Sequence, residues 1–190
     1  MRILFILFFM FAASAIPASA QDSSFGSMRD TSVNLRSWKT LDTTRLEISS
    51  SSFDNNGMIP ARYSCEGENI SPALTVTGIP PGTKSLSLVL HDPDAPMNGG
   101  FTHWVVWNID PDGNFSDNIA KAQQGLNDSK KQGYTGMCPP SGTHRYYFKV
   151  YALDNKLNLG KGTNRISLEK AMNGHILGQG ELVGLYTKTK

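Results

Sequence analysis

Hydrophobic and polar residues alternate with a period of two along several segments of the chain, which is the pattern of β-strands. Residues 85–91 read SLSLVLH, and Val89 makes the second face of this segment partly apolar as well. Residues 103–109 are rich in β-branched and aromatic side chains, and residues 144–153 place Tyr, Phe, Val and Ala on one face. Together with shorter strands near 46–53, 73–77 and 181–187, these segments predict a mainly β domain.

Two other segments break this pattern. Residues 167–177 carry an apolar stripe at helical spacing that ends in His175, so they predict one helix, with Gly178 as its stop. Residues 110–140 are dominated by Gly, Asn, Asp and Ser and predict a loop. A connection of that length is typical of a functional segment.

The first 20 residues predict a secretory signal peptide. Arg2 supplies a basic start, residues 3–15 are almost uninterruptedly apolar, and Ala18-Ser19-Ala20 offers small residues for cleavage after Ala20. The alternative is a membrane anchor, but this apolar run is shorter than the ~20 residues that span a bilayer. We therefore expect a signal peptide over 1–20, a flexible leader over 21–45, a folded domain over 46–190, no stable membrane anchor, and export to the periplasm or the medium.

Composition narrows the class of protein. The chain has 190 residues, with 18 Lys plus Arg against 16 Asp plus Glu, a net charge of +2, and 39% hydrophobic residues. These values exclude a disordered tail and give no reason to expect a nucleic-acid partner. The two cysteines, Cys65 and Cys138, both fall in the exported part. In an oxidising compartment a disulfide is favoured, with a reactive thiol as the alternative.

Polar side chains gather where the strands begin and end. His91 and Asp92 close one strand, His103 opens the next, and His144 opens the strand after it. If the strand at 85–91 is antiparallel to both of the others, these side chains meet at one edge of a sheet.

Several ordered motifs resemble the phosphatidylethanolamine-binding protein family, and its bacterial Raf-kinase-inhibitor-like branch in particular. They are DPDAP at 92–96, HW at 103–104, PP at 139–140 and HRY at 144–146, within a similarity that covers about 47–187. The resemblance implies a large central antiparallel sheet packed on a smaller sheet, with flanking helices. It also implies a pocket for phosphate, phosphoethanolamine or carboxylate.

The resemblance assigns the pocket residue by residue. The ligand-binding set that it implies is Asp92, His103, Cys138, Pro139, Pro140, His144 and Tyr146. Imidazole and phenol groups can donate to phosphate oxygens, and Asp92 would hold a histidine ring in place. Asp94 and Trp104 are expected to support this pocket. Asp94 could instead brace the DPDAP turn, and Trp104 could instead lie in the core.

The leading hypothesis is an exported protein that binds a small anionic or phosphorylated ligand, without enzymatic activity, metal or cofactor. Asp92, His103 and His144 could instead form an acid–base or two-His-one-carboxylate site, which would make the protein a hydrolase. A third reading is a secreted protease inhibitor or interaction module that offers the loop at 110–140 to a protein partner.

Overall fold

The computed structural model describes residues 44–112, 115–119 and 121–189. The expected signal peptide at 1–20 and the leader up to residue 43 lie outside the described residues. The last two residues assigned to the leader, Thr44 and Arg45, form a short strand that pairs with the C-terminal strand. No helix in the described ranges is long and apolar enough to cross a membrane.

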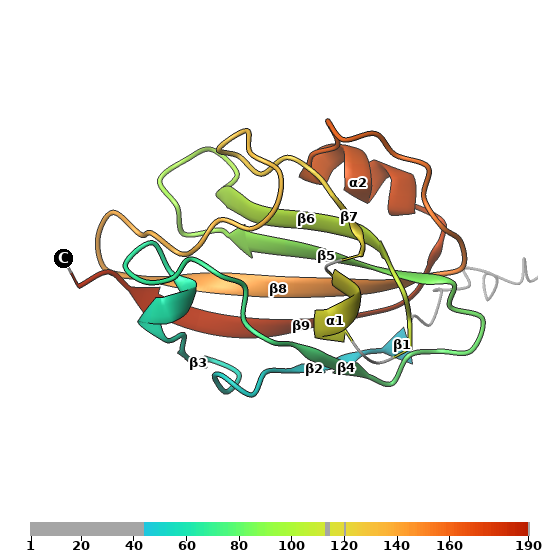
Figure 1. Ribbon diagram of the computed structural model, residues 1–190, viewed down its shortest axis with the longest axis horizontal. Coiled ribbons are helices and arrows are strands. Elements are labelled where there is room, and N and C mark those ends of the chain that lie inside the picture. The colour runs from blue at the N-terminus through green and yellow to red at the C-terminus, as the bar shows by residue number, and fades with distance from the viewer. Residues whose placement is uncertain (1–43, 113–114, 120, 190) are drawn as a thin grey trace, which may run out of the picture. The chain divides into compact units, whose positions relative to one another are not determined.

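In chain order, the elements are β1 (Thr44–Arg45), β2 (Glu47–Ser49), β3 (Gly57–Met58), a 3₁₀ turn (Ala61–Tyr63), β4 (Thr75–Thr77), β5 (Ser85–Asp92), β6 (Phe101–Ile109), α1 (Phe115–Ile119), β7 (Gln123–Gln124), β8 (Thr143–Leu153), α2 (Arg165–Met172) and β9 (Ile176–Thr187). The first strands along the chain are short, and the long strands β5, β6, β8 and β9 follow, with the two-residue strand β7 between β6 and β8 (Figure 1).

The main sheet has the order β1-β9-β8-β5-β6-β7, and β3 also pairs with β9. Strand β5 is antiparallel to both β6 and β8, which is the arrangement that brings the polar strand ends to one edge. The sheet is mixed and not purely antiparallel, because the two-residue strands β1 and β3 run parallel to β9. The mainly β fold with a large and a small sheet is otherwise as expected.

Two hydrophobic cores lie on opposite faces of the main sheet. One face packs against the small β2–β4 sheet through Val76, Leu88 and Phe148. The other packs against α2, where Leu168 and Met172 belong to the same buried cluster as Val105. All eight residues of β5 are buried, in agreement with its apolar pattern on both faces. In Figure 1, α2 and the β2–β4 pair accordingly lie apart on either side of the long strands.

The predicted helix at 167–177 is wrong at both ends. Helix α2 begins earlier because the Asn164 side chain accepts a hydrogen bond from the backbone of Ser167. It ends at Met172, and Gly174 follows in the left-handed region at φ 83°. His175 is therefore outside the helix, and β9 starts directly after it. The loop predicted at 110–140 also contains the short elements α1 and β7.

Candidate functional site

A cavity of about 340 Å³ lies at the edge of the main sheet where β5 ends and β6 begins. Its wall combines the DPDAP turn, the start of β6 and the segment that leads into β8. The lining residues are Asp92, Ala95, Pro96, Met97, Phe101, His103, Ser129, Thr135, Gly136, Cys138, Pro139 and Pro140.

Asp92 is the buried carboxylate of this wall, and both of its oxygens are engaged. Its Oδ2 lies 2.8 Å from Nδ1 of His144, and the two side chains are only 4% and 9% exposed. Its Oδ1 accepts hydrogen bonds from the backbone N–H groups of Asp94 at 2.8 Å and Ala95 at 3.1 Å. Asp92 therefore shapes the turn and orients the His144 ring at the same time.

His103 reaches the cavity through an irregularity in its strand. Leu90 pairs with Trp104 and His91 pairs with Thr102, so His103 is an extra residue between two paired positions. Such a bulge re-aims a side chain that regular alternation would point elsewhere. Nδ1 of His103 lies 2.8 Å from the carbonyl oxygen of Thr135. A carbonyl only accepts, so Nδ1 carries a proton and Nε2 is the ring nitrogen left for a ligand.

Burial lowers the pKa of His103 below its ordinary value of 6.5. The backbone of Thr135 and Gly136 and the carboxylates of Asp92 and Asp128 act in the opposite direction, without outweighing the loss of solvation. At neutral pH the ring is consequently uncharged, with a hydrogen on Nδ1 and a lone pair on Nε2.

Tyr146 lies directly behind His103. The two rings meet edge to face at a centroid distance of 5.3 Å, and Tyr146 is completely buried. Its hydroxyl makes no hydrogen bond of ordinary geometry with the described residues, although the Asp92 carboxylate lies close enough to interact with it. Burial and the neighbouring Asp92 carboxylate raise the pKa of Tyr146, so the hydroxyl keeps its proton and remains a donor. A buried hydroxyl without a hydrogen bond of ordinary geometry beside a cavity is unusual in a folded protein.

The rim of the cavity is held by the segment around residues 61–69. The predicted disulfide between Cys65 and Cys138 is present, with the two Cα atoms 5.5 Å apart. The backbone N–H of Cys65 donates to Met137 at 3.1 Å, and that of Gly136 donates to Oδ1 of Asn69 at 2.7 Å. A Cβ on Gly136 would lie only 2.6 Å from Asn69 Oδ1, so this close approach requires glycine.

The residues assigned from the sequence occupy three positions. Asp92, His103, Cys138, Pro139 and Pro140 line the cavity. His144 and Tyr146 stand behind it and touch Asp92 and His103. The two support residues point elsewhere: Asp94 pairs with Arg145, and Trp104 is in the core with its indole N–H donating to Gln124.

Several lining residues were missed. Met97 follows the DPDAP motif and Phe101 precedes the HW motif, while Ser129 and Thr135 lie in the predicted loop at 110–140. The contribution of Thr135 to the geometry comes from its backbone carbonyl. Backbone contacts leave no trace in residue type, whereas the aromatic Phe101 next to the HW motif was a usable signal.

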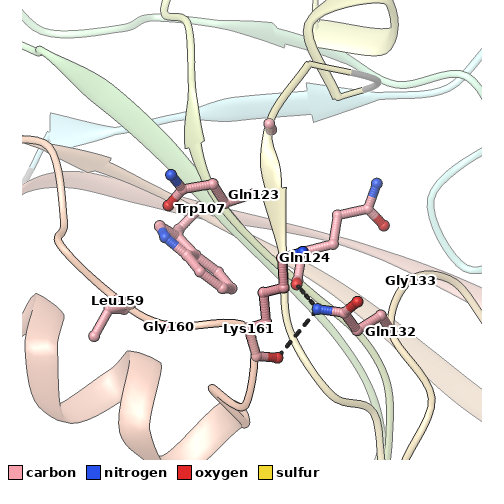
Figure 2. Close-up of a pocket in the computed structure, with 9 residues that line it drawn as sticks. Trp107, Gln123, Gln124, Gln132, Gly133, Leu159, Gly160 and Lys161 are labelled. Carbon is pink, nitrogen blue, oxygen red and sulfur yellow. Dashed lines mark hydrogen bonds between the residues drawn. The ribbon is translucent and has the colours of Figure 1, made fainter.

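A second, larger hollow of about 650 Å³ has a different chemistry (Figure 2). Its polar wall is made of the amides of Gln123, Gln124 and Gln132, and Lys161 is the one ionisable residue among its described lining residues. The Gln132 side chain donates to the carbonyls of Gln124 and Lys161, as the dashed lines in Figure 2 mark. This hollow has no histidine or carboxylate in its described lining.

In the described ranges, no group of three or more His, Cys, Asp or Glu side chains is arranged to hold a metal ion. The loop envisaged as an inhibitory segment is tied down at its C-terminal part by the disulfide and by Asn127, which donates to Gly133 and Thr135. Its use against a protein partner stays a prediction.

The model of the phosphatidylethanolamine-binding protein family matches residues 49–187, almost all of the described domain. The chain belongs to this family. The UPF0098 protein PH1269 of Pyrococcus horikoshii is 50% identical over 150 residues, which are 73% of this chain and 75% of that protein. Against a longer UPF0098 protein of Archaeoglobus fulgidus, 47% identical, the match spans half of the relative's length.

Solved structures of family members share the fold. CT736 of Chlamydia trachomatis, a homologue in this family, has a TM-score of 0.72 and 39% identity, covering 77% of this chain and 100% of that one. YbcL of Escherichia coli has a TM-score of 0.70 and 30% identity, covering 76% and 99%. The edge-of-sheet cavity thus lies in a fold of the phosphatidylethanolamine-binding protein family.

Proposed function

We propose that this protein binds a small anionic ligand in the cavity between Asp92 and His103. The observation that carries the proposal is the His103 ring in the cavity wall: its Nδ1 is held by Thr135, its Nε2 is the nitrogen left for a ligand, and the buried hydroxyl of Tyr146 stands behind it. A concave site with a few convergent polar groups in an apolar wall is typical of small-molecule binding. Membership of a family named for a phospholipid supports a ligand-binding role.

The size and lining of the cavity favour a metabolite or a head group. Its volume of about 340 Å³ is at the lower end of ligand pockets, which range over roughly 300–1,000 Å³. Phe101, Pro139 and Pro140 offer apolar contact, while Ser129 and Thr135 add hydroxyl groups. The ligand class that fits is a phosphate, phosphoethanolamine or carboxylate, with its oxygens toward His103.

We also propose that the protein works outside the cytoplasm. The signal-peptide pattern of residues 1–20 and a disulfide next to the cavity support this, because disulfides persist in oxidising compartments. Mass analysis of the protein recovered from the periplasm or the medium tests it. A mature chain that begins at Gln21 is expected, and retention of residues 1–20 would contradict export.

Calorimetric titration with phosphoethanolamine tests the binding role. We expect one site per chain and a loss of tenfold or more in affinity for His103→Ala, because a hydrogen bond to a charged group contributes roughly 1.5–3 kcal/mol. Gln132→Ala, in the amide-lined hollow, is the matched control and should bind as the wild type does. If His103→Ala also binds as the wild type does, the ligand site is elsewhere.

A further inference from the structure

The cavity lacks a permanent positive charge. None of its described lining residues is a lysine or an arginine, and the ionisable side chains among them are Asp92 and His103. The guanidinium of the neighbouring Arg145 is engaged in two hydrogen bonds with Asp94 and is about half exposed. An anion that enters this cavity finds no fixed cation to offset its charge.

The Asp92–His144 pair does not supply a fixed positive charge. If His144 is neutral, the pair carries the charge of the Asp92 carboxylate, and if His144 is protonated, the two charges cancel. In neither state does the pair add net positive charge to the wall. Because Asp92 also uses its other oxygen for two backbone N–H groups, this carboxylate is held in place and cannot turn away from an incoming anion.

His103 is then the remaining group that can become a cation. In its neutral form it presents the lone pair of Nε2, which cannot donate to an oxyanion. The charged and titratable groups that face it are Asp92 at the end of β5, Asp128 in the segment before β8 and Tyr146 in β8. The backbone of Thr135 and Gly136 and the ring of Phe101 complete its surroundings. The two carboxylates favour a charged ring, but burial outweighs them and lowers the pKa of His103, so the free protein keeps the ring neutral at neutral pH.

We propose that the cavity takes up its anion together with one proton, and that Nε2 of His103 holds this proton in the complex. This inference rests on the proposed function and adds the protonation state that the site selects. In the complex the imidazolium of His103 offsets one negative charge of the ligand next to Asp92–His144, which lowers the cost of bringing an anion to a buried carboxylate. The specificity-determining group is His103, with Thr135 fixing which nitrogen faces the ligand.

Proton uptake gives the affinity a defined pH dependence. Between the pKa of His103 in the free protein and its higher pKa in the complex, the association constant falls about tenfold for each unit of rising pH. Above the pKa of His103 in the complex, the association constant no longer changes with pH, because the neutral ring then binds without a proton. A site with a fixed lysine or arginine would show no such slope in this range.

The experiment is calorimetry with phosphoethanolamine at pH 8, where its phosphate is dianionic. Titrations run in several cationic buffers of different ionisation enthalpy, so that the buffer does not compete for the cavity. The dependence of the binding enthalpy on the buffer counts the protons taken up, and a net uptake above zero and of at most one proton is expected. The ring resonances of His103, one of four histidines in the chain, should move toward the imidazolium position during the same titration.

Two variants locate the proton. His103→Gln keeps a donor toward Thr135 and cannot titrate, so it should bind more weakly and take up no proton, whereas His144→Gln should retain the uptake. If His103→Gln does not fold, the ring resonances of His103 in the wild type show whether this residue takes up the proton. Binding with the same enthalpy in every buffer overturns the inference and leaves the proposed function standing. Uptake that persists in His103→Gln overturns the assignment to His103. Absence of binding at pH 5–8 overturns the proposed function and the inference together.

Discussion

Two histidine–aspartate pairs in this protein have the same geometry and opposite surroundings. His144 with Asp92 and His175 with Asp154 both have an Nδ1–Oδ distance of 2.8 Å. The side chains of the first pair are 9% and 4% exposed, and those of the second are 44% and 47% exposed. The distance alone thus does not determine how much a pair contributes to stability. The exposure of the two side chains to solvent determines it.

The two pairs also have different places in the fold. Asp154 follows β8 and His175 precedes β9, and a backbone hydrogen bond from Asp154 to His175 closes the same junction. This pair joins the ends of neighbouring strands and lines neither of the two cavities described above. The Asp92–His144 pair adjoins the cavity and shares its rim with the disulfide, so removal of one partner leaves a buried charge or a void.

The largest expected effect concerns the rim around the buried pair. Cys65→Ser/Cys138→Ser removes a link across 73 residues, and we expect a loss of about 2–4 kcal/mol in the free energy of unfolding. Urea denaturation of the variant and the wild type, both without reductant, measures it. Reductant should lower the stability of the wild type toward that of the variant and leave the variant unchanged. A difference in the free energy of unfolding below about 0.5 kcal/mol would mean that the hydrogen bonds of the rim hold it in place without the disulfide.

The second prediction compares the pairs directly. His144→Ala should weaken phosphoethanolamine binding by about tenfold to a hundredfold, because Asp92 is left buried without its partner beside the anion. His175→Ala should change the affinity less than about twofold, because water replaces the lost partner of Asp154. Calorimetry on both variants measures the difference. Equal losses in the two variants would show that the position of the buried pair has no part in binding.

Much of this arrangement was readable from the sequence. The apolar alternation placed the long strands, and the polar residues at their ends met at one edge once β5 proved antiparallel to β6 and β8. The cysteine pairing followed from two cysteines and an export pattern and is confirmed. These features depend on period, residue type and count, which a single chain displays.

Other features depend on backbone geometry that residue type does not reveal. The extra residue in β6 that turns His103 into the cavity has no marker in HWVVWNI, and the Thr135 carbonyl that fixes its tautomer is common to every residue. The helix at 167–177 was overextended because Ile176 and Leu177 are apolar at a spacing that fits a strand start as well as a helix end. In the folded protein, pairing with β8 places the start of β9 at Ile176.

The smallest expected effect comes from an ion pair of intermediate exposure. Asp94 and Arg145 make a bidentate contact with distances of 2.9 and 2.6 Å, and their side chains are 26% and 53% exposed. The hydrogen bond from Arg145 lowers the pKa of Asp94 from 3.8 to about 2. A carboxyl with a lowered pKa stabilises the fold above its ordinary pKa, and this contribution is lost as the pH falls from about 4 to about 2.

Asp94→Asn should therefore lower the midpoint of thermal unfolding by only about 1–3 °C at pH 7, because solvent screens a pair this exposed. At pH 2 most of this difference should be gone, since the pH then equals the lowered pKa of Asp94 and about half of its carboxyl is protonated in the folded protein. Scanning calorimetry at pH 7, 4, 3 and 2 measures the difference. If solvent access ranks the pairs, Asp94→Asn must cost less stability than His144→Ala despite its better hydrogen-bond geometry. A deficit that persists unchanged at pH 2 would instead trace the loss to the backbone contact from Arg145 N–H to Asp94 Oδ2, and charge would have no part in it.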